Sequence, residues 1–271
     1  MKNKDRQFNK PEILAPAGTK EALSAAVNAG CDAVYLGGDL FSARAFAGNF
    51  SEEDLIKSLD YCHLFDIKIY MTVNTLMKQS EILSLEDYMR TFYNAGLDGV
   101  IIQDMGAAMV LKEAFPLLDL HASTQMSISS EYGARLLKSM GFTRIVPARE
   151  LSLKEIRKIK ENSDIEIESF VHGAMCYACS GKCLFSSFMG GRSGNRGRCA
   201  QPCRQCYEII GSRQQDSRQF CPPSMLHGTG SMKLWATGIL YSVIAAGRSM
   251  QTLATMQKRG CGARSNMQSR L

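Results

Sequence analysis

The sequence predicts an α/β protein built as a TIM-like (β/α)8 barrel, and three observations carry that prediction. Apolar runs typical of buried strands alternate with amphipathic helical segments at intervals of roughly 20–35 residues. Residues 28–36, 94–102 and, more loosely, 139–147 repeat one unit, in which a helix end and a glycine precede a buried strand. No G-x-G-x-x-G follows the first strand, which argues against a doubly wound dinucleotide-binding sheet.

The predicted strands are short apolar runs bounded by Gly, Pro or polar residues, the pattern of strands buried on both faces. They are expected at residues 11–18, 32–38, 68–74, 98–104, 119–126, 144–151 and 165–171. Seven such units before residue 172, with polar residues where the strands end, favour a barrel.

The predicted helices lie between these strands and have local signals at their ends. They are expected at residues 20–29, 51–66, 83–95, 106–114 and 129–140, and after Ser152. Thr19, Ser51 and Ser152 are suited to cap the helices that they precede, because a hydroxyl oxygen can accept from a free N–H of the first turn. Glycines follow several of the helix ends, where a left-handed residue is common.

The last part of the chain differs in composition from the rest. No Asp or Glu follows Asp216, although about six or seven acids would be ordinary over 55 residues. The net charge of +6 therefore resides in residues 217–271. We predict that this acid-free tail is an out-of-frame or truncated translation; the rival interpretation is a genuine basic RNA-binding tail. The eighth strand is then missing or improvised from residues 239–246, and the barrel is incomplete at its C-terminus.

The N-terminal residues and the hydropathy of the chain bear on its cellular compartment. The N-terminal residues lack the apolar run of a signal peptide, and no segment approaches the roughly 18 apolar residues of a membrane span. We therefore expect a cytoplasmic protein with no membrane association. In a reducing cytosol, clustered cysteines are more often metal ligands or redox groups than structural disulfides.

Polar residues at the strand ends are candidates for function, because (β/α)8 barrels carry their sites at the carboxyl ends of the strands. The candidate catalytic residues are His121, Arg149, Glu168 and His172. Each residue taken alone is equally suited to be an interior polar group or a helix cap, but the set shares one predicted rim.

Residues 168–206 hold six of the ten cysteines, as C-x2-C-x3-C and then C-x3-C-x2-C. Converging thiolates repel one another unless a cation neutralises them. An iron–sulfur cluster takes four cysteine ligands, whereas zinc often takes two C-x2-C pairs. Cys176/Cys179 and Cys203/Cys206 would make such pairs. The basic loop at residues 190–198 is either a solvated linker or a grip on phosphates.

Residues 168–183 read E-x-F-x2-G-A-M-C-x4-G-x-C and are followed by Ser186. This motif resembles the signature of the peptidase U32 family, also called collagenase-like proteases. Phe185 departs from it, since the signature has an aliphatic residue before the serine. The segments PEILAPAG, AGCDAVYLGG, HASTQMSI and VPARELSL are also similar to this family, so the resemblance covers residues 11–215.

The family name implies a peptidase, but other members resemble hydroxylation factors that act on tRNA, on ribosomal RNA or in quinone biosynthesis. The resemblance implies a [4Fe–4S] cluster on Cys176, Cys183 and Cys199 with a varying fourth ligand, here Cys203 or Cys221. It also implies RNA as a partner, together with a family partner subunit. Zinc is the alternative metal.

We therefore expect an iron–sulfur-dependent tRNA or rRNA base hydroxylation factor. Its predicted parts are barrel units 1–172, a Cys-rich cluster-binding segment 173–216 and the tail 217–271. A collagenase-like peptidase is the first alternative, although no G-x-S-x-G or H-E-x-x-H is present to supply its chemistry. An inactive metal-binding fragment is the second.

Overall fold

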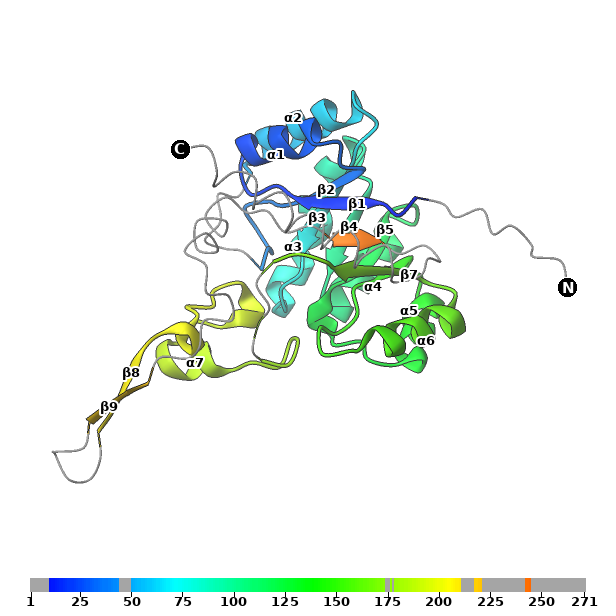
Figure 1. The fold of residues 1–271 in the computed structure, drawn as a ribbon. Coiled ribbons are helices and arrows are strands. Elements are labelled where there is room, and N and C mark those ends of the chain that lie inside the picture. Colours follow the sequence, from blue (N-terminus) through cyan, green and yellow to red (C-terminus); the bar gives the residue numbers. More distant parts are fainter. Residues whose placement is uncertain are drawn as a thin grey trace, which may run out of the picture.

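The computed structural model describes residues 10–43, 50–173, 176, 178–210, 217–220 and 242–244 (Figure 1). Its strands form a closed barrel in the order β1-β10-β7-β6-β5-β4-β3-β2. The seven parallel strands are β1 Ile13–Pro16, β2 Ala33–Gly37, β3 Lys68–Val73, β4 Gly99–Ile102, β5 Asp119–Ala122, β6 Arg144–Ile145 and β7 Glu166–Phe170. The predicted TIM-like α/β fold is thereby confirmed.

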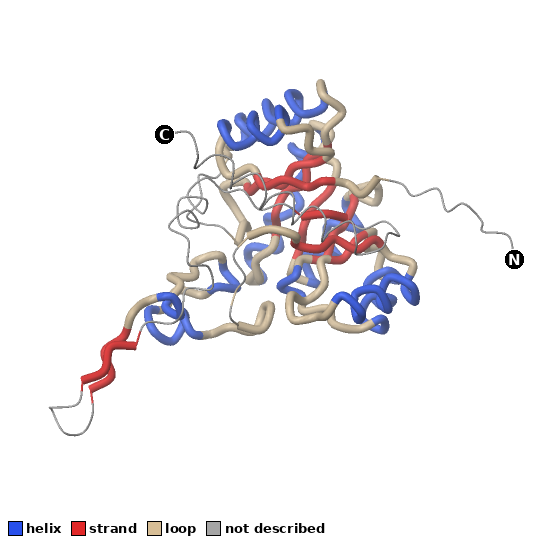
Figure 2. Tube along the Cα trace, in the orientation of Figure 1, coloured by secondary structure: helices blue, strands red, loops and turns tan. Residues whose placement is uncertain are grey.

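Helices surround the strands, as Figure 2 shows. They are α1 Lys20–Asn28, α2 Glu52–His63, α3 Gln79–Asn94, α4 Met105–Ala114, α5 Glu131–Ser139 and α6 Leu153–Ser163. The expected caps are present: the side chains of Thr19, Ser51 and Ser152 accept from the backbone N–H groups of Ala22, Asp54 and Glu155. Helix starts were predictable here because a cap is a contact between near neighbours in sequence.

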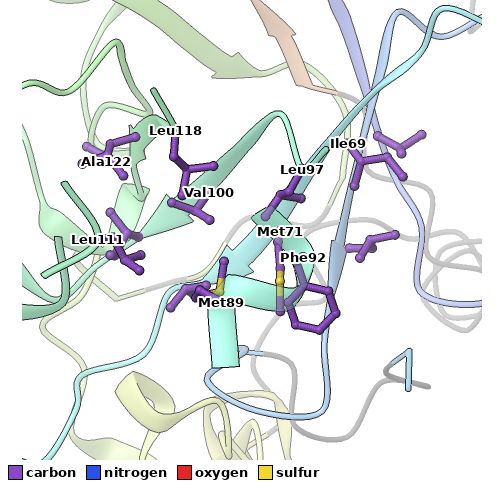
Figure 3. Packing of buried hydrophobic residues seen from close by; sticks show 14 of the residues in the cluster. Ile69, Met71, Met89, Phe92, Leu97, Val100, Leu111, Leu118 and Ala122 are labelled. Atoms are coloured by element: carbon purple, nitrogen blue, oxygen red, sulfur yellow. The ribbon is translucent and has the colours of Figure 1, made fainter. Parts of the chain in front are cut away.

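Two layers of apolar side chains follow from the alternation of each strand. One set of strand residues, including Ile69, Met71 and Val100, packs outward against helix residues such as Met89 and Phe92 (Figure 3). The opposite faces of the strands supply a smaller buried cluster inside the barrel: Leu14, Ala33, Tyr35, Tyr70 and Ile101. Strand register is therefore fixed by burial on both faces.

Several predicted element boundaries are wrong, three of them by the largest margins. The strand expected at 119–126 ends at Ala122, because Ser123 accepts from the N–H of Gln125 and starts a 3-10 turn, η1 Thr124–Met126. The strand expected at 144–151 pairs over only two residues, and Pro147 has no N–H for a longer ladder. Helix α3 begins four residues before the expected start.

The eighth strand of the barrel is antiparallel to its two neighbours. Strand β10, Ser242–Ile244, lies antiparallel to both β1 and β7, with Val243 opposite Ile13 and Ser169. The parallel repeat is thus incomplete at its C-terminus, as predicted, and the expected segment 239–246 supplies the substitute. The barrel closes, so the two strand edges of an open barrel do not arise among the described residues.

Beyond β7 the chain leaves the barrel. It forms helix α7 Phe185–Gly190, the 3-10 turns η2 Gly194–Arg196 and η3 Pro202–Arg204, and the hairpin β8 Tyr207–Ile210 with β9 Ser217–Phe220. The hairpin projects away from the barrel (Figure 1). Cys221 and most of the predicted tail lie outside the described residues. Across the described part of the chain, each helix is too short or too polar for a bilayer crossing.

Candidate functional site

The Cys-rich segment, taken here as residues 176–206 and described except for residue 177, is attached to the carboxyl ends of the barrel strands. Its residues near Ser180 contact the loops that follow β5 and β6. Its residues near Arg196 contact the loops that follow β2 and β3. The segment therefore lies at the barrel end where sites of this fold are built.

The first attachment centres on Ser180, which is buried. Its Oγ accepts from the backbone N and the Nε of Arg149 at 3.3 and 3.0 Å, and donates to Glu150 Oε2 at 3.2 Å. Ser127 donates its hydroxyl to the carbonyl of Ser180. Burial opposes the charge of Glu150, but backbone N–H groups, including that of Ser180, outweigh it and lower its pKa.

The residue after this serine must be glycine. Gly181 has a φ of +67°, and a Cβ at this position would lie 2.0 Å from the carbonyl oxygen of Gln125. Both the left-handed backbone and the close approach exclude a larger residue without a shift of the loop. Gly181 belongs to the motif noted in the sequence, and this contact gives its physical reason.

The second attachment is an ion pair. Arg196 Nη1 and Nη2 donate to the two carboxylate oxygens of Glu81 at 2.7 and 2.5 Å, and Nη1 also donates to the carbonyl of Leu76 at 2.6 Å. The hydrogen bonds from Arg196, with one from the backbone of Lys78, lower the pKa of Glu81 to about 2. Next to this pair, a Cβ on Gly197 would lie 2.5 Å from the carbonyl oxygen of Ser42.

This pairing revises the interpretation of the basic loop at residues 190–198. The middle of the loop is not a solvated linker, because Arg196 is held by Glu81 and Leu76. The same contacts occupy Arg196, so this arginine is not a phosphate grip. Arg192 and Arg198 remain exposed on either side.

Three of the predicted ligand cysteines lie near the fourth, Cys203. Cys176, Cys183, Cys199 and Cys203 are free thiols. Burial raises the pKa of Cys203, and so does its proximity to Cys176, Cys199 and Cys183, whereas Arg204 lowers it. Cys179 is also a free thiol, whereas Cys206 is disulfide-bonded. Among the described residues, no three His, Cys, Asp or Glu side chains are already arranged to hold a metal ion.

Helix α7 ties the two halves of the cysteine segment together. It begins two residues after Cys183, and the buried Oγ of its Ser186 accepts from the N–H of Ala200 at 2.9 Å. Cys199 Sγ accepts from the N–H of Gln201 at 3.3 Å. A hydrogen bond to sulfur stabilises a thiolate, the form that a metal requires.

Two predicted catalytic residues lie inside the barrel. The side chain of His121 is 1% exposed and packs edge-on against the ring of Tyr70, with 4.5 Å between the ring centroids. Burial, with the charges of Arg144 and Lys68, lowers the pKa of His121 well below its usual value, so its ring is neutral. Glu168 is buried as well, and its charge helps to keep Arg144 protonated.

The four predicted catalytic residues thus occupy three settings. His121 and Glu168 are interior, Arg149 belongs to the first attachment, and His172 is exposed just beyond β7. The attachment residues Ser127, Glu81 and Arg196 were missed by the sequence reasoning. Their partners lie 53 and 115 residues away, so no local pattern could have found them.

Comparison with known proteins places these features in context. The model of Peptidase family U32 matches residues 18–238. Over 200 residues the chain is 42% identical to tRNA hydroxylation protein P1 of Bacillus subtilis, covering 74% of this chain and 47% of that protein. Over 198 residues it is 41% identical to the 23S rRNA 5-hydroxycytidine C2501 synthase of Escherichia coli, covering 73% and 30%. The chain therefore spans less than half the length of these two relatives.

A solved structure of a U32 peptidase has a similar fold. It aligns with a TM-score of 0.52 at 14% sequence identity, covering 62% of this chain and 70% of that one. At this identity the likeness concerns the fold alone.

Proposed function

The chain belongs to peptidase family U32, and from that premise we propose that it is an iron–sulfur-dependent base hydroxylation factor for tRNA or rRNA. The two relatives named for RNA hydroxylation support this proposal. The observation that carries it is that Cys176, Cys183 and Cys199 lie close enough to Cys203, at the carboxyl end of the barrel, to raise its pKa. A cytoplasmic location is part of the proposal.

In this proposal Cys176, Cys183, Cys199 and Cys203 hold a [4Fe–4S] cluster. Four thiolates match the ligand number and type that such a cluster takes. When bound, the cluster supplies one-electron redox chemistry. Zinc on Cys176/Cys179 and Cys203/Cys206 has less support, because Cys206 is disulfide-bonded and so is not a free thiolate ligand.

The chain's own residues have separate tasks in the proposal. Arg149 and Glu150 act through Ser180 and position the cysteine segment, so Arg149 is a positioning residue rather than a catalytic one. His121 is neutral, and a neutral imidazole has one nitrogen that accepts a proton and one that donates it. His121 and Glu168 are therefore proposed to handle protons within the barrel, with His172 outside it.

The peptidase alternative lacks a matching arrangement. Nδ1 of His121 has no hydrogen-bond partner in the part of the chain that the structure describes, whereas the base of a catalytic triad needs an orienting carboxylate there. His63 Nε2 does lie 3.0 Å from Asp98 Oδ2, but Asp98 precedes β4 at the opposite barrel end and also accepts from the N–H of Ile69. The second alternative, an inactive metal-binding fragment, predicts bound metal without RNA hydroxylation.

The nucleoside composition of cellular RNA tests the proposed function. We expect deletion of the gene to remove a hydroxylated pyrimidine from tRNA or ribosomal RNA, as measured by mass spectrometry of the digested RNA. The wild-type gene should restore it, and Cys199→Ser should not. Unchanged profiles in both RNA classes would contradict RNA hydroxylation.

A further inference from the structure

The Cys-rich segment is strongly one-sided in charge. Residues 176–206 contain five Lys or Arg and no Asp or Glu. Arg196 is already paired with Glu81. The other four cations are all exposed: Lys182, Arg192, Arg198 and Arg204. Helix α6 offers a contrast, because its exposed Lys and Arg alternate with Glu155 and Glu161. Of these two regions, only the Cys-rich segment is both attached to the barrel rim and free of acidic residues.

Helix α7 adds exposed apolar side chains to this charge. Ser186 is its one buried residue, and Phe188 is 83% exposed, with Leu184, Phe185 and Met189 also exposed. An exposed ring flanked by cations is typical of surfaces that bind single-stranded nucleic acid, because unstacked bases stack on the ring while cations contact phosphates.

The end of α7 brings two of the cations, Arg192 and Arg198, together. Gly191 adopts a φ of +67°, its N–H donates to the carbonyl of Ser187, and the N–H of Arg192 donates to that of Ser186. This left-handed turn reverses the chain directly after the helix. Arg192 Nε then donates to the carbonyl of Arg198 at 3.2 Å, which places the two arginines side by side. Arg198 directly precedes Cys199, so the charge lies next to a proposed cluster ligand.

We propose that Lys182, Phe188, Arg192 and Arg198, here called the α7 surface, dock a single-stranded loop of the substrate RNA. One base stacks on Phe188, and the cations contact the adjoining phosphates. The inference rests on the proposed function and adds to it the face that receives the RNA. Charge complementarity favours RNA as the occupant, because cations without an intervening acid match the continuous negative charge of a phosphate backbone.

Binding of the full-length protein to a fluorescein-labelled RNA hairpin with a single-stranded loop, measured by fluorescence anisotropy, tests this surface. We expect Phe188→Leu to weaken binding about tenfold, because leucine keeps the apolar bulk but loses the ring face. Phe188→Trp should restore it. A blunt duplex with the same stem should bind more weakly and should not distinguish these variants.

The arginines give a second measurement with a matched control. We expect Arg198→Ala to weaken binding several-fold and to reduce the dependence of log affinity on log salt by about one unit. Arg157→Ala removes an equally exposed arginine from α6 and should leave both quantities at their wild-type values. Circular dichroism of each variant checks that the fold is intact.

The outcomes separate this inference from the proposed function. If the wild-type protein binds the hairpin but Phe188→Leu and Arg198→Ala bind it equally well, the α7 surface is not the docking face, whatever the nucleoside profile shows. Failure of the wild-type protein to bind the hairpin would also overturn it. If both variants lose binding while gene deletion leaves all nucleosides unchanged, the surface stands and hydroxylation fails.

Discussion

The two ends of the barrel are built on opposite principles. At the amino end, Arg144 is almost fully buried and donates to Glu12 at 3.1 Å and to Glu166 at 2.8 Å, while its guanidinium lies 5.1 Å from the ring centroid of Tyr70. Tyr70 in turn donates to Glu12. The charges of this network, called here the Arg144 network, are therefore paired and hydrogen-bonded.

At the carboxyl end, by contrast, some buried polar atoms of the described residues have no hydrogen-bond partner. The Gln103 and Gln125 Oε1 atoms are buried and have no hydrogen-bond partner in the described part of the chain. Several cysteines of the attached segment are exposed, and two glycines there have left-handed backbones against neighbouring carbonyls. A satisfied end stabilises a fold, whereas an end with unmet polar groups and free thiols is suited to bind something.

The largest expected effect comes from a substitution in the Arg144 network at the amino end of the barrel. We expect Arg144→Ala to lower the free energy of unfolding by about 3–5 kcal/mol, because it leaves Glu12 without its cation in a largely buried site. Urea denaturation measures this change. Lys57→Ala removes an exposed i,i+4 pair and should leave the unfolding midpoint where it is. Iron per folded molecule should stay at the wild-type level in Arg144→Ala; a selective loss of iron would contradict the division between the two ends.

A smaller effect at the carboxyl end comes from two glycines with the same φ of +67°. Gly191→Ala meets no atom within 4 Å and should cost about 1 kcal/mol through backbone strain alone. Gly181→Ala adds a clash with the Gln125 carbonyl and should release the segment from the barrel. Limited proteolysis should cut residues 176–206 faster in Gly181→Ala than in Gly191→Ala. Equal rates would show that this contact does not hold the segment.

The smallest effect is the pH dependence of the second attachment. The pKa of Glu81 is lowered from 4.5 to about 2, so its stabilisation is complete above pH 4.5 and is lost as pH falls toward 2. We expect Glu81→Gln to be about 1 kcal/mol less stable than wild type near neutral pH, since both partners are partly exposed. This difference should shrink on acidification through that range. A difference that stays constant with pH would contradict the pairing.

Local signals allowed much of the barrel to be predicted. Caps such as Thr19 and apolar runs such as residues 68–74 act over a few residues, so a single sequence contains them. The shortened β5 was harder to predict, because the local turn at Ser123 is accompanied by a distant contact, in which Thr124 donates to the carbonyl of Pro147. The antiparallel β10 likewise depends on pairing with β1 and β7, which are distant in the chain.

The residue types of the site could be predicted from the sequence better than their arrangement in space. The cysteine count and spacing pointed to a metal, and the family motif pointed to Cys176, Cys183 and Cys199. The attachment of that segment through Ser180 and Arg196 depends on contacts across the fold, and these include a hydrogen bond from Arg149 to Ser180 that its sequence position did not indicate.

The metal content of the anaerobically purified protein tests the central claim most directly. We expect iron and acid-labile sulfide in equal amounts, with visible absorption of an iron–sulfur cluster. Cys183→Ser and Cys199→Ser should abolish both, while Cys179→Ser, the matched control within the same segment, should retain them. Colourless protein that contains zinc alone, or loss of iron in Cys179→Ser with retention in Cys183→Ser, would contradict the proposed ligand set.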